Sequence, residues 1–136
     1  MTGTDSQTRS VIVERELAHP PEKIWRALTQ SHLIGEWLMQ TDFQLNEGHE
    51  FSFNADWGRI DCQVVTLEPN RMLAYNWVSQ GLDSVVTWTL TPSETGTLLR
   101  MEQTGFHPGQ RQALTGATAG WPRFLDKLEQ LLAGTD

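Results

Sequence analysis

Residues 114–132, LTGATAGWPRFLDKLEQLL, decide the fold of this 136-residue chain. Their apolar side chains recur every three or four residues, the spacing that places side chains on one face of an α-helix. This apolar set comprises Leu114, Ala117, Trp121, Phe124, Leu125, Leu128, Leu131 and Leu132. Pro122 lies inside the stretch, where a proline removes one helical hydrogen bond. We therefore predict a long C-terminal helix with a kink after Trp121. The alternative is a break that leaves a shorter helix over 122–133.

The segment that precedes this helix, residues 43–106, has the pattern of an antiparallel sheet. Turn signals such as Asp56–Gly58 recur about every ten residues, and the runs between them alternate, as in Leu73–Trp77 and Val86–Leu90. Alternation with a period of two is typical of strands that bury one face. Residues 60–67 alternate less regularly, which indicates a strand with a bulge. The pattern predicts a meander of about six strands.

The N-terminal part adds a strand and two short helices. Ser10–Ala18 alternates like a strand, and Pro21–Leu28 has the spacing of a short amphipathic helix. Ser31 is expected to cap a second short helix, in which Leu33 and Trp37 lie four residues apart. The apolar face of the meander must be covered, and the C-terminal helix is long enough to do so. We predict an α+β fold in which a curved antiparallel sheet of six or seven strands wraps around the long C-terminal helix. Residues 1–9 are expected to form a disordered tail, and 10–133 a single domain.

Composition restricts the partners of the chain. It has 17 acidic and 10 basic residues, a net charge of −7, and its Lys and Arg residues are scattered. This argues against nucleic acids and anionic membranes, which select clustered basic residues. No stretch approaches the roughly 20 apolar residues that span a bilayer, and the polar first ten residues do not resemble a signal peptide. With a single cysteine, Cys62, no intrachain disulfide can form. We expect a cytoplasmic protein with neither a nucleic-acid nor a membrane partner.

The sequence contains no pattern that identifies a catalytic or metal site. Acid–base catalysis needs titratable groups within hydrogen-bond reach of a substrate, and no pair here has a spacing that enforces this. The titratable candidates are Arg15, His49, Asp56, Asp61, Tyr75 and Glu102. The four histidines form no HxH or HExxH motif, and Cys62 is predicted to be a small buried hydrophobe. Gly48, Gly58 and Gly81 form no phosphate-binding loop. We therefore predict no catalytic residues, no metal and no cofactor.

The order of elements and several local motifs resemble the START-like, birch-pollen-allergen-like helix-grip superfamily. Within it, the chain resembles the family of activators of heat-shock-protein-90 ATPase (SRPBCC type). The segments that carry the resemblance are Glu14–Leu17, Pro20–Leu28, Glu36–Leu38, Arg71–Trp77, Val85–Leu90, Gly96-Thr97, Gln103–Phe106 and Gly120–Leu128. The order and spacing of these motifs, which cover about residues 10–133, are more specific than any one of them. Relatives include ligand binders, self-resistance proteins against natural-product toxins, and polyketide-cyclase- and aromatase-like enzymes.

A cavity is expected between the inner face of the sheet and the long helix, because a curved sheet and a straight helix do not fit tightly everywhere. Strand alternation and the helix stripe select aromatic and apolar side chains for its wall, together with Gln103, which could orient a ligand as donor and acceptor. The predicted ligand-binding residues are Phe53, Tyr75, Trp77, Trp88, Met101, Gln103, Trp121, Phe124 and Leu125. The alternative is that these side chains fill the space, as in most protein interiors.

The expected function is the binding of a small, flat hydrophobic molecule. The first alternative is an enzyme of the polyketide cyclase or hydrolase type, which requires an ionisable group in the cavity. A chaperone-activator role ranks third, because the relatives that give the family this name are larger and carry an additional N-terminal domain that this sequence lacks. A homodimer through Trp25 and Trp37 on the short helices is a further open alternative.

Overall fold

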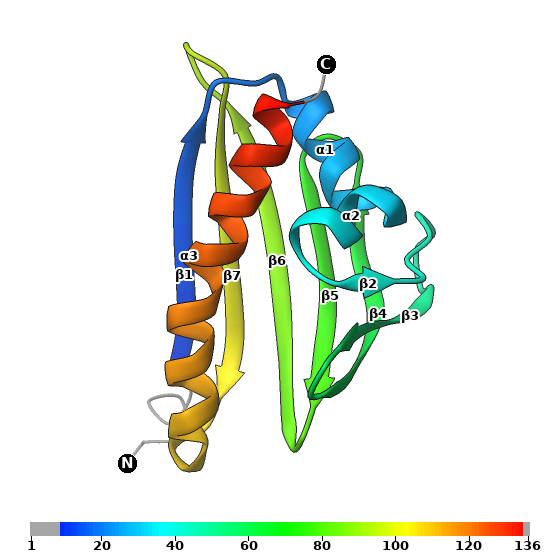
Figure 1. Ribbon diagram of the computed structural model, residues 1–136, viewed down its shortest axis with the longest axis vertical. Helices are drawn as coiled ribbons and strands as arrows, with labels where there is room; N and C mark the ends of the chain where they lie inside the picture. Colours follow the sequence, from blue (N-terminus) through cyan, green and yellow to red (C-terminus); the bar gives the residue numbers. More distant parts are fainter. Residues whose placement is uncertain (1–8, 135–136) are drawn as a thin grey trace.

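The computed structural model describes residues 9–134 and shows a single antiparallel sheet with helices packed on one face (Figure 1). The elements in chain order are β1 (Arg9–Leu17), α1 (Pro21–Thr29), α2 (Ser31–Trp37), β2 (Gln40–Thr41), β3 (Glu50–Ala55), β4 (Gly58–Glu68), β5 (Met72–Ser79), β6 (Leu82–Pro92), β7 (Thr97–Phe106), the 3-10 helix η2 (Pro108–Gln110) and α3 (Arg111–Ala133).

The sheet has seven strands in the order β1-β7-β6-β5-β4-β3-β2. Strands β2 to β7 form a meander, and β1 joins it as an edge strand beside β7. Together with the long C-terminal helix and the two short helices between β1 and β2, this confirms the predicted helix-grip fold. Arg9, which we assigned to the tail, is the first residue of β1. The rest of the predicted tail, residues 1–8, lies outside the described residues.

Strand β4 contains the bulge that its irregular pattern predicts. Ile60, Cys62 and Val64 are buried on the inner face. The register with β5 then shifts between Val64 and Thr66, and Val65 is 57% exposed. An extra residue of this kind bends a strand and increases its twist. The bulge therefore contributes to the curvature of the sheet around α3.

Helix α3 is continuous from Arg111 to Ala133 with Pro122 inside it. The alternative of a shorter helix that starts at Pro122 is therefore wrong, whereas the kink stays a prediction. Proline removes one hydrogen bond, and the helix persists because its neighbouring turn is held by packing: Trp121 and Leu125 are 3% and 1% exposed. Arg15 of β1 adds polar contacts, since its guanidinium lies 3.0 Å from Asp126 Oδ1 and 2.5 Å from Glu129 Oε2.

The apolar core lies between the sheet and the C-terminal half of α3, with α1 and α2 beside that half (Figure 1). Trp25 and Trp37 belong to this core, with exposures of 6% and 2%, and Trp37 Nε1 donates a hydrogen bond to Ala27 O at 2.8 Å. The partial exposure on which the alternative of a dimer through Trp25 and Trp37 depended is therefore wrong, because the apolar side of a short helix is here its buried side.

Candidate ligand-binding cavity

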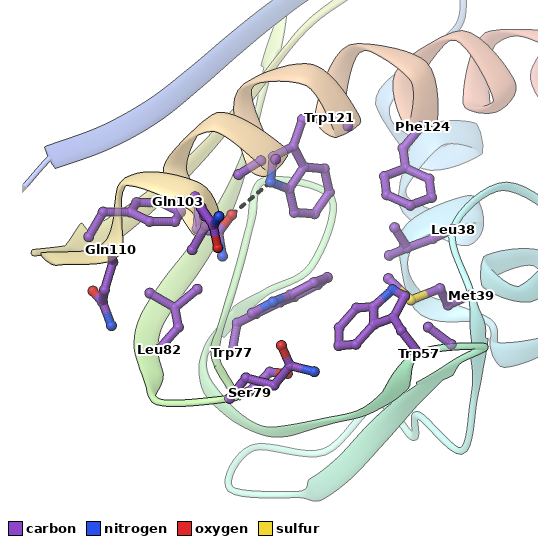
Figure 2. Close-up of a pocket in the computed structure, with 18 of the residues that line it drawn as sticks. Leu38, Met39, Trp57, Trp77, Ser79, Leu82, Gln103, Gln110, Trp121 and Phe124 are labelled. Carbon is purple, nitrogen blue, oxygen red and sulfur yellow. Dashed lines mark hydrogen bonds between the residues drawn. The ribbon is translucent and has the colours of Figure 1, made fainter.

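A cavity of about 990 Å³ opens beside the N-terminal half of α3. Its wall combines the loop after α2, the ends of β3, β5, β6 and β7, and the start of α3 (Figure 2). The lining residues are Leu38, Met39, Asn54, Ala55, Asp56, Trp57, Trp77, Ser79, Gln80, Leu82, Gln103, Phe106, Gly109, Gln110, Arg111, Gln112, Ala113, Gly116, Ala117, Gly120, Trp121 and Phe124.

The cavity exists because the helix places small side chains above this part of the sheet. Ala113, Gly116, Ala117 and Gly120 face it within two turns of α3. A Cβ atom built on Gly116 or Gly120 would meet no atom within 4 Å other than those of its own helix and chain neighbours. Glycine also weakens a helix by roughly 1 kcal/mol relative to alanine. Two glycines in this helix therefore leave space at a cost in helix stability.

One side of the cavity is formed by three aromatic rings, Trp77, Trp121 and Phe124, which we call the aromatic wall. The ring centroids of Trp77 and Trp121 are 5.4 Å apart, and those of Trp121 and Phe124 are 5.8 Å apart. Behind the wall, Trp88 contacts Trp121 edge to face at 5.6 Å. Such ring contacts fix the orientation of each side chain, because offset and edge-on geometries are preferred. The wall is therefore a preformed apolar surface.

Four of the nine predicted ligand-binding residues line the cavity: Trp77, Gln103, Trp121 and Phe124. The structure places the other five, Phe53, Tyr75, Trp88, Met101 and Leu125, in the core, none more than 3% exposed. They do lie on the inner side of the molecule, as alternation indicates. However, other side chains of the core cover them: Trp88, for example, contacts Trp37 of α2 edge-on, with ring centroids 5.6 Å apart.

The side-chain amide of Gln103 is hydrogen-bonded to two other side chains of the protein. Its Oε1 accepts a hydrogen bond from Trp121 Nε1 at 2.8 Å, and its Nε2 donates to Ser84 Oγ at 3.0 Å. Ser84 Oγ in turn donates to Trp77 O at 2.9 Å. Gln103 is 2% exposed, so both ends of its amide are used inside the protein. From β7, Gln103 therefore holds the Trp121 ring of the aromatic wall in place.

Apart from Asp56, the residues at the rim of the cavity were not predicted from the sequence. Trp57 and Gln80 lie in the turns of the β3–β4 and β5–β6 hairpins, and Gln110 precedes α3. Gln110 ties two of these segments together, because its Nε2 donates to Gly81 O at 2.9 Å and its Oε1 accepts from His107 N at 2.8 Å. The sequence could have indicated these residues, because the turns of antiparallel hairpins lie at the two ends of a sheet. Each turn is therefore near either the start or the end of the helix that packs on the sheet.

Among the titratable candidates, Asp56 alone lines the cavity, together with Arg111, which the prediction did not include. Tyr75 is fully buried and its hydroxyl accepts a hydrogen bond from Trp88 Nε1 at 2.9 Å. Burial raises the pKa of Tyr75 well above its ordinary value, so that the phenol stays neutral. Burial likewise raises the pKa of the Cys62 thiol, which makes it a poor nucleophile. The lining of the cavity therefore contains one carboxylate, that of Asp56, and one guanidinium, that of Arg111.

Within residues 9–134, no group of three or more His, Cys, Asp or Glu side chains could hold a metal ion. In the same part of the chain, no helix is both long and apolar enough to cross a membrane.

The sheet, the gripped helix and the cavity beside it define a helix-grip protein of the α+β class. The family model described as "Activator of Hsp90 ATPase homolog 1-like protein" matches residues 18–133, so the chain belongs to this family. No curated protein matches the chain.

Solved structures support the same assignment. Protein MLL2253 from Mesorhizobium loti is 58% identical with a TM-score of 0.91, and the match covers 94% of this chain and 99% of that one. CalU16 from Micromonospora echinospora is 28% identical with a TM-score of 0.81, covering 93% of this chain and 77% of that one. DynU16, from the dynemicin biosynthetic locus, is 24% identical with a TM-score of 0.82; the match covers 91% of this chain but 47% of DynU16, and it shows the fold alone.

Proposed function

We propose that this protein binds a small, flat and largely apolar molecule in the cavity beside the N-terminal half of α3. The observation that carries the proposal is a space of about 990 Å³ in direct contact with a preformed aromatic wall. Sites for small molecules typically measure about 300–1,000 Å³ and combine apolar walls with a few polar groups. Here the polar groups gather at the rim, which includes Asn54, Asp56 and Gln80.

Binding rather than catalysis is the function that this site supports best. A single carboxylate at the rim does not provide the acid and base that a cyclase or hydrolase would need within reach of one substrate. Family membership supports the proposal at the level of the fold, since one fold hosts many functions and the site has to decide between them.

The test is a titration followed by intrinsic tryptophan fluorescence, because Trp77 and Trp121 lie in the wall. The panel contains sterols, flavonoids, fatty acids and polyketides. We expect saturable quenching by at least one flat compound, and we expect its loss in a variant that fills the cavity, Gly116→Leu/Gly120→Leu. Val65→Ala, on the outside of the sheet, is the matched control. Absence of saturable binding across the panel, or equal binding to the filled variant, would contradict the proposal.

A further inference from the structure

Trp57 differs from every other tryptophan of the chain. It is 57% exposed, whereas the other five tryptophans are at most 8% exposed. It occupies the two-residue turn Asp56-Trp57 between β3 and β4, and it still belongs to the lining of the cavity. Hairpin turns ordinarily carry small or polar residues, because they are exposed to solvent. A large apolar ring at such a turn, directed at a cavity, therefore needs an explanation other than core packing.

The direction of the Trp57 side chain gives that explanation. In Figure 2 the indole lies between Trp77 and Met39, with Phe124 on the opposite, helix side of the space. The aromatic wall is joined by ring contacts of 5.4 and 5.8 Å. Within residues 9–134, the ring contacts that join the wall and the core do not include Trp57. The cavity thus has one fixed aromatic side and, among the described residues, one more exposed indole that stacks on no other aromatic ring.

We propose that Trp57 is the capping residue of this site, whose indole stacks on a bound ring system and holds it against the aromatic wall. The inference rests on the proposed function and adds a selectivity to it. A flat ring offers two faces and can contact the wall and Trp57 together, whereas a flexible chain gains little from stacking. Trp57 therefore selects ring systems over aliphatic chains of similar size. Asp56, the neighbour of Trp57 in the turn, places a negative charge at the same rim.

The experiment compares two probes by isothermal titration calorimetry, the aromatic dye 8-anilinonaphthalene-1-sulfonate and the aliphatic chain laurate. The variants are Trp57→Ala, which removes the ring, and Trp57→Phe, which keeps one. Val65→Ala is the control, because Val65 has the same exposed fraction and does not line the cavity. Since Trp57 is exposed and lies in a turn, its variants should fold and unfold like the wild type, which circular dichroism and thermal unfolding check.

We expect Trp57→Ala to raise the Kd of the dye about tenfold or more, Trp57→Phe to raise it less than about threefold, and the Kd of laurate to change less than about threefold in both. Val65→Ala should leave both constants unchanged. If the wild type binds the dye and Trp57→Ala binds it with the same Kd, the capping role is overturned and the proposed function stands. Equal losses for dye and laurate would overturn the stacking selectivity. A wild-type protein that binds neither probe would contradict the proposed function and the capping role together.

Discussion

The two halves of α3 cross the same sheet, yet one forms a core and the other forms a cavity. From Trp121 onward, the helix buries Trp121, Leu125, Leu128 and Leu132 against the sheet and the short helices. From Arg111 to Gly120, no residue is fully buried. The difference lies in side-chain volume, because the positions of the first half that face the cavity include Ala113, Gly116, Ala117 and Gly120, whereas the buried positions of the second half are leucine and tryptophan.

If the proposed function holds, this difference separates stability and binding along one helix. The second half contributes apolar burial, which is the dominant favourable term in folding. The first half buries less apolar surface and contains glycines that weaken a helix, and the space beside it is large enough for a small ligand. Gln103 stands at the boundary between the halves, because its amide holds Trp121, the residue where the packed half begins and which also lines the cavity. The following predictions test this division.

The largest effect is expected from truncation in the packed half. Leu128 is 0% exposed, so Leu128→Ala should lower the free energy of unfolding by about 2–5 kcal/mol through lost burial and a new void. The same change in the first half, Leu114→Ala, should cost less than about 1 kcal/mol, because Leu114 is only partly buried. Urea denaturation measures both. Equal losses would show that the two halves are packed alike.

The boundary residue should show a smaller effect that depends on its partner. Gln103→Met leaves Trp121 Nε1 and Ser84 Oγ with one partner fewer, which should cost about 1–3 kcal/mol. In a Trp121→Phe background the indole N–H is absent, so the same change should cost less. A double-mutant cycle by urea denaturation isolates the coupling. Strictly additive costs would mean that Gln103 does not position Trp121.

Filling the cavity should raise stability rather than lower it. In Gly116→Leu/Gly120→Leu, each new side chain enters open space, and leucine is a far better helix former than glycine. We expect about 1–2 kcal/mol of added stability. Thermal unfolding followed by circular dichroism measures the change. A lower unfolding midpoint would mean that these glycines are required by packing, against our explanation of the cavity.

The smallest effect concerns the ion pairs of the packed half. Arg15→Met removes the contacts to Asp126 and Glu129, which are 62% and 44% exposed, so the expected loss is about 0.5–1 kcal/mol and should diminish at high salt. Arg59→Met, at an ion pair in which both side chains are more than 60% exposed, serves as the comparison and should be near neutral. Salt-independent losses in Arg15→Met would point to apolar packing of the arginine stem instead.

The sequence predicts the fold well because its signals are local. Alternation in Leu73–Trp77 and Val86–Leu90 assigns strands and their inner faces, and the helix stripe assigns α3 through Pro122. Alternation does not tell where along a strand the helix packs closely. For this reason Trp77 lines the cavity, whereas Trp88, on the same face of the neighbouring strand, lies in the core away from it.

Two features of the site required the tertiary structure. The partners of Gln103 come from β6 and α3, and no spacing in the sequence indicates that its amide is used internally. Trp57 was not among the predicted ligand-binding residues, because a residue in a turn is not part of a periodic apolar pattern. By contrast, the small residues at 113, 116, 117 and 120 were visible in the sequence, and their helical spacing could have located the cavity beside the first half of α3.

The most direct test of the division between the two halves is nitrogen–proton NMR of the labelled protein during titration with a flat compound that quenches its tryptophan fluorescence. We predict that the largest chemical-shift changes fall on residues 109–121 of the helix and on the hairpin turns at 54–57 and 79–82, with small changes over 125–133. Shifts concentrated on 125–133, or spread evenly over the whole helix, would contradict the assignment of binding to the first half of α3.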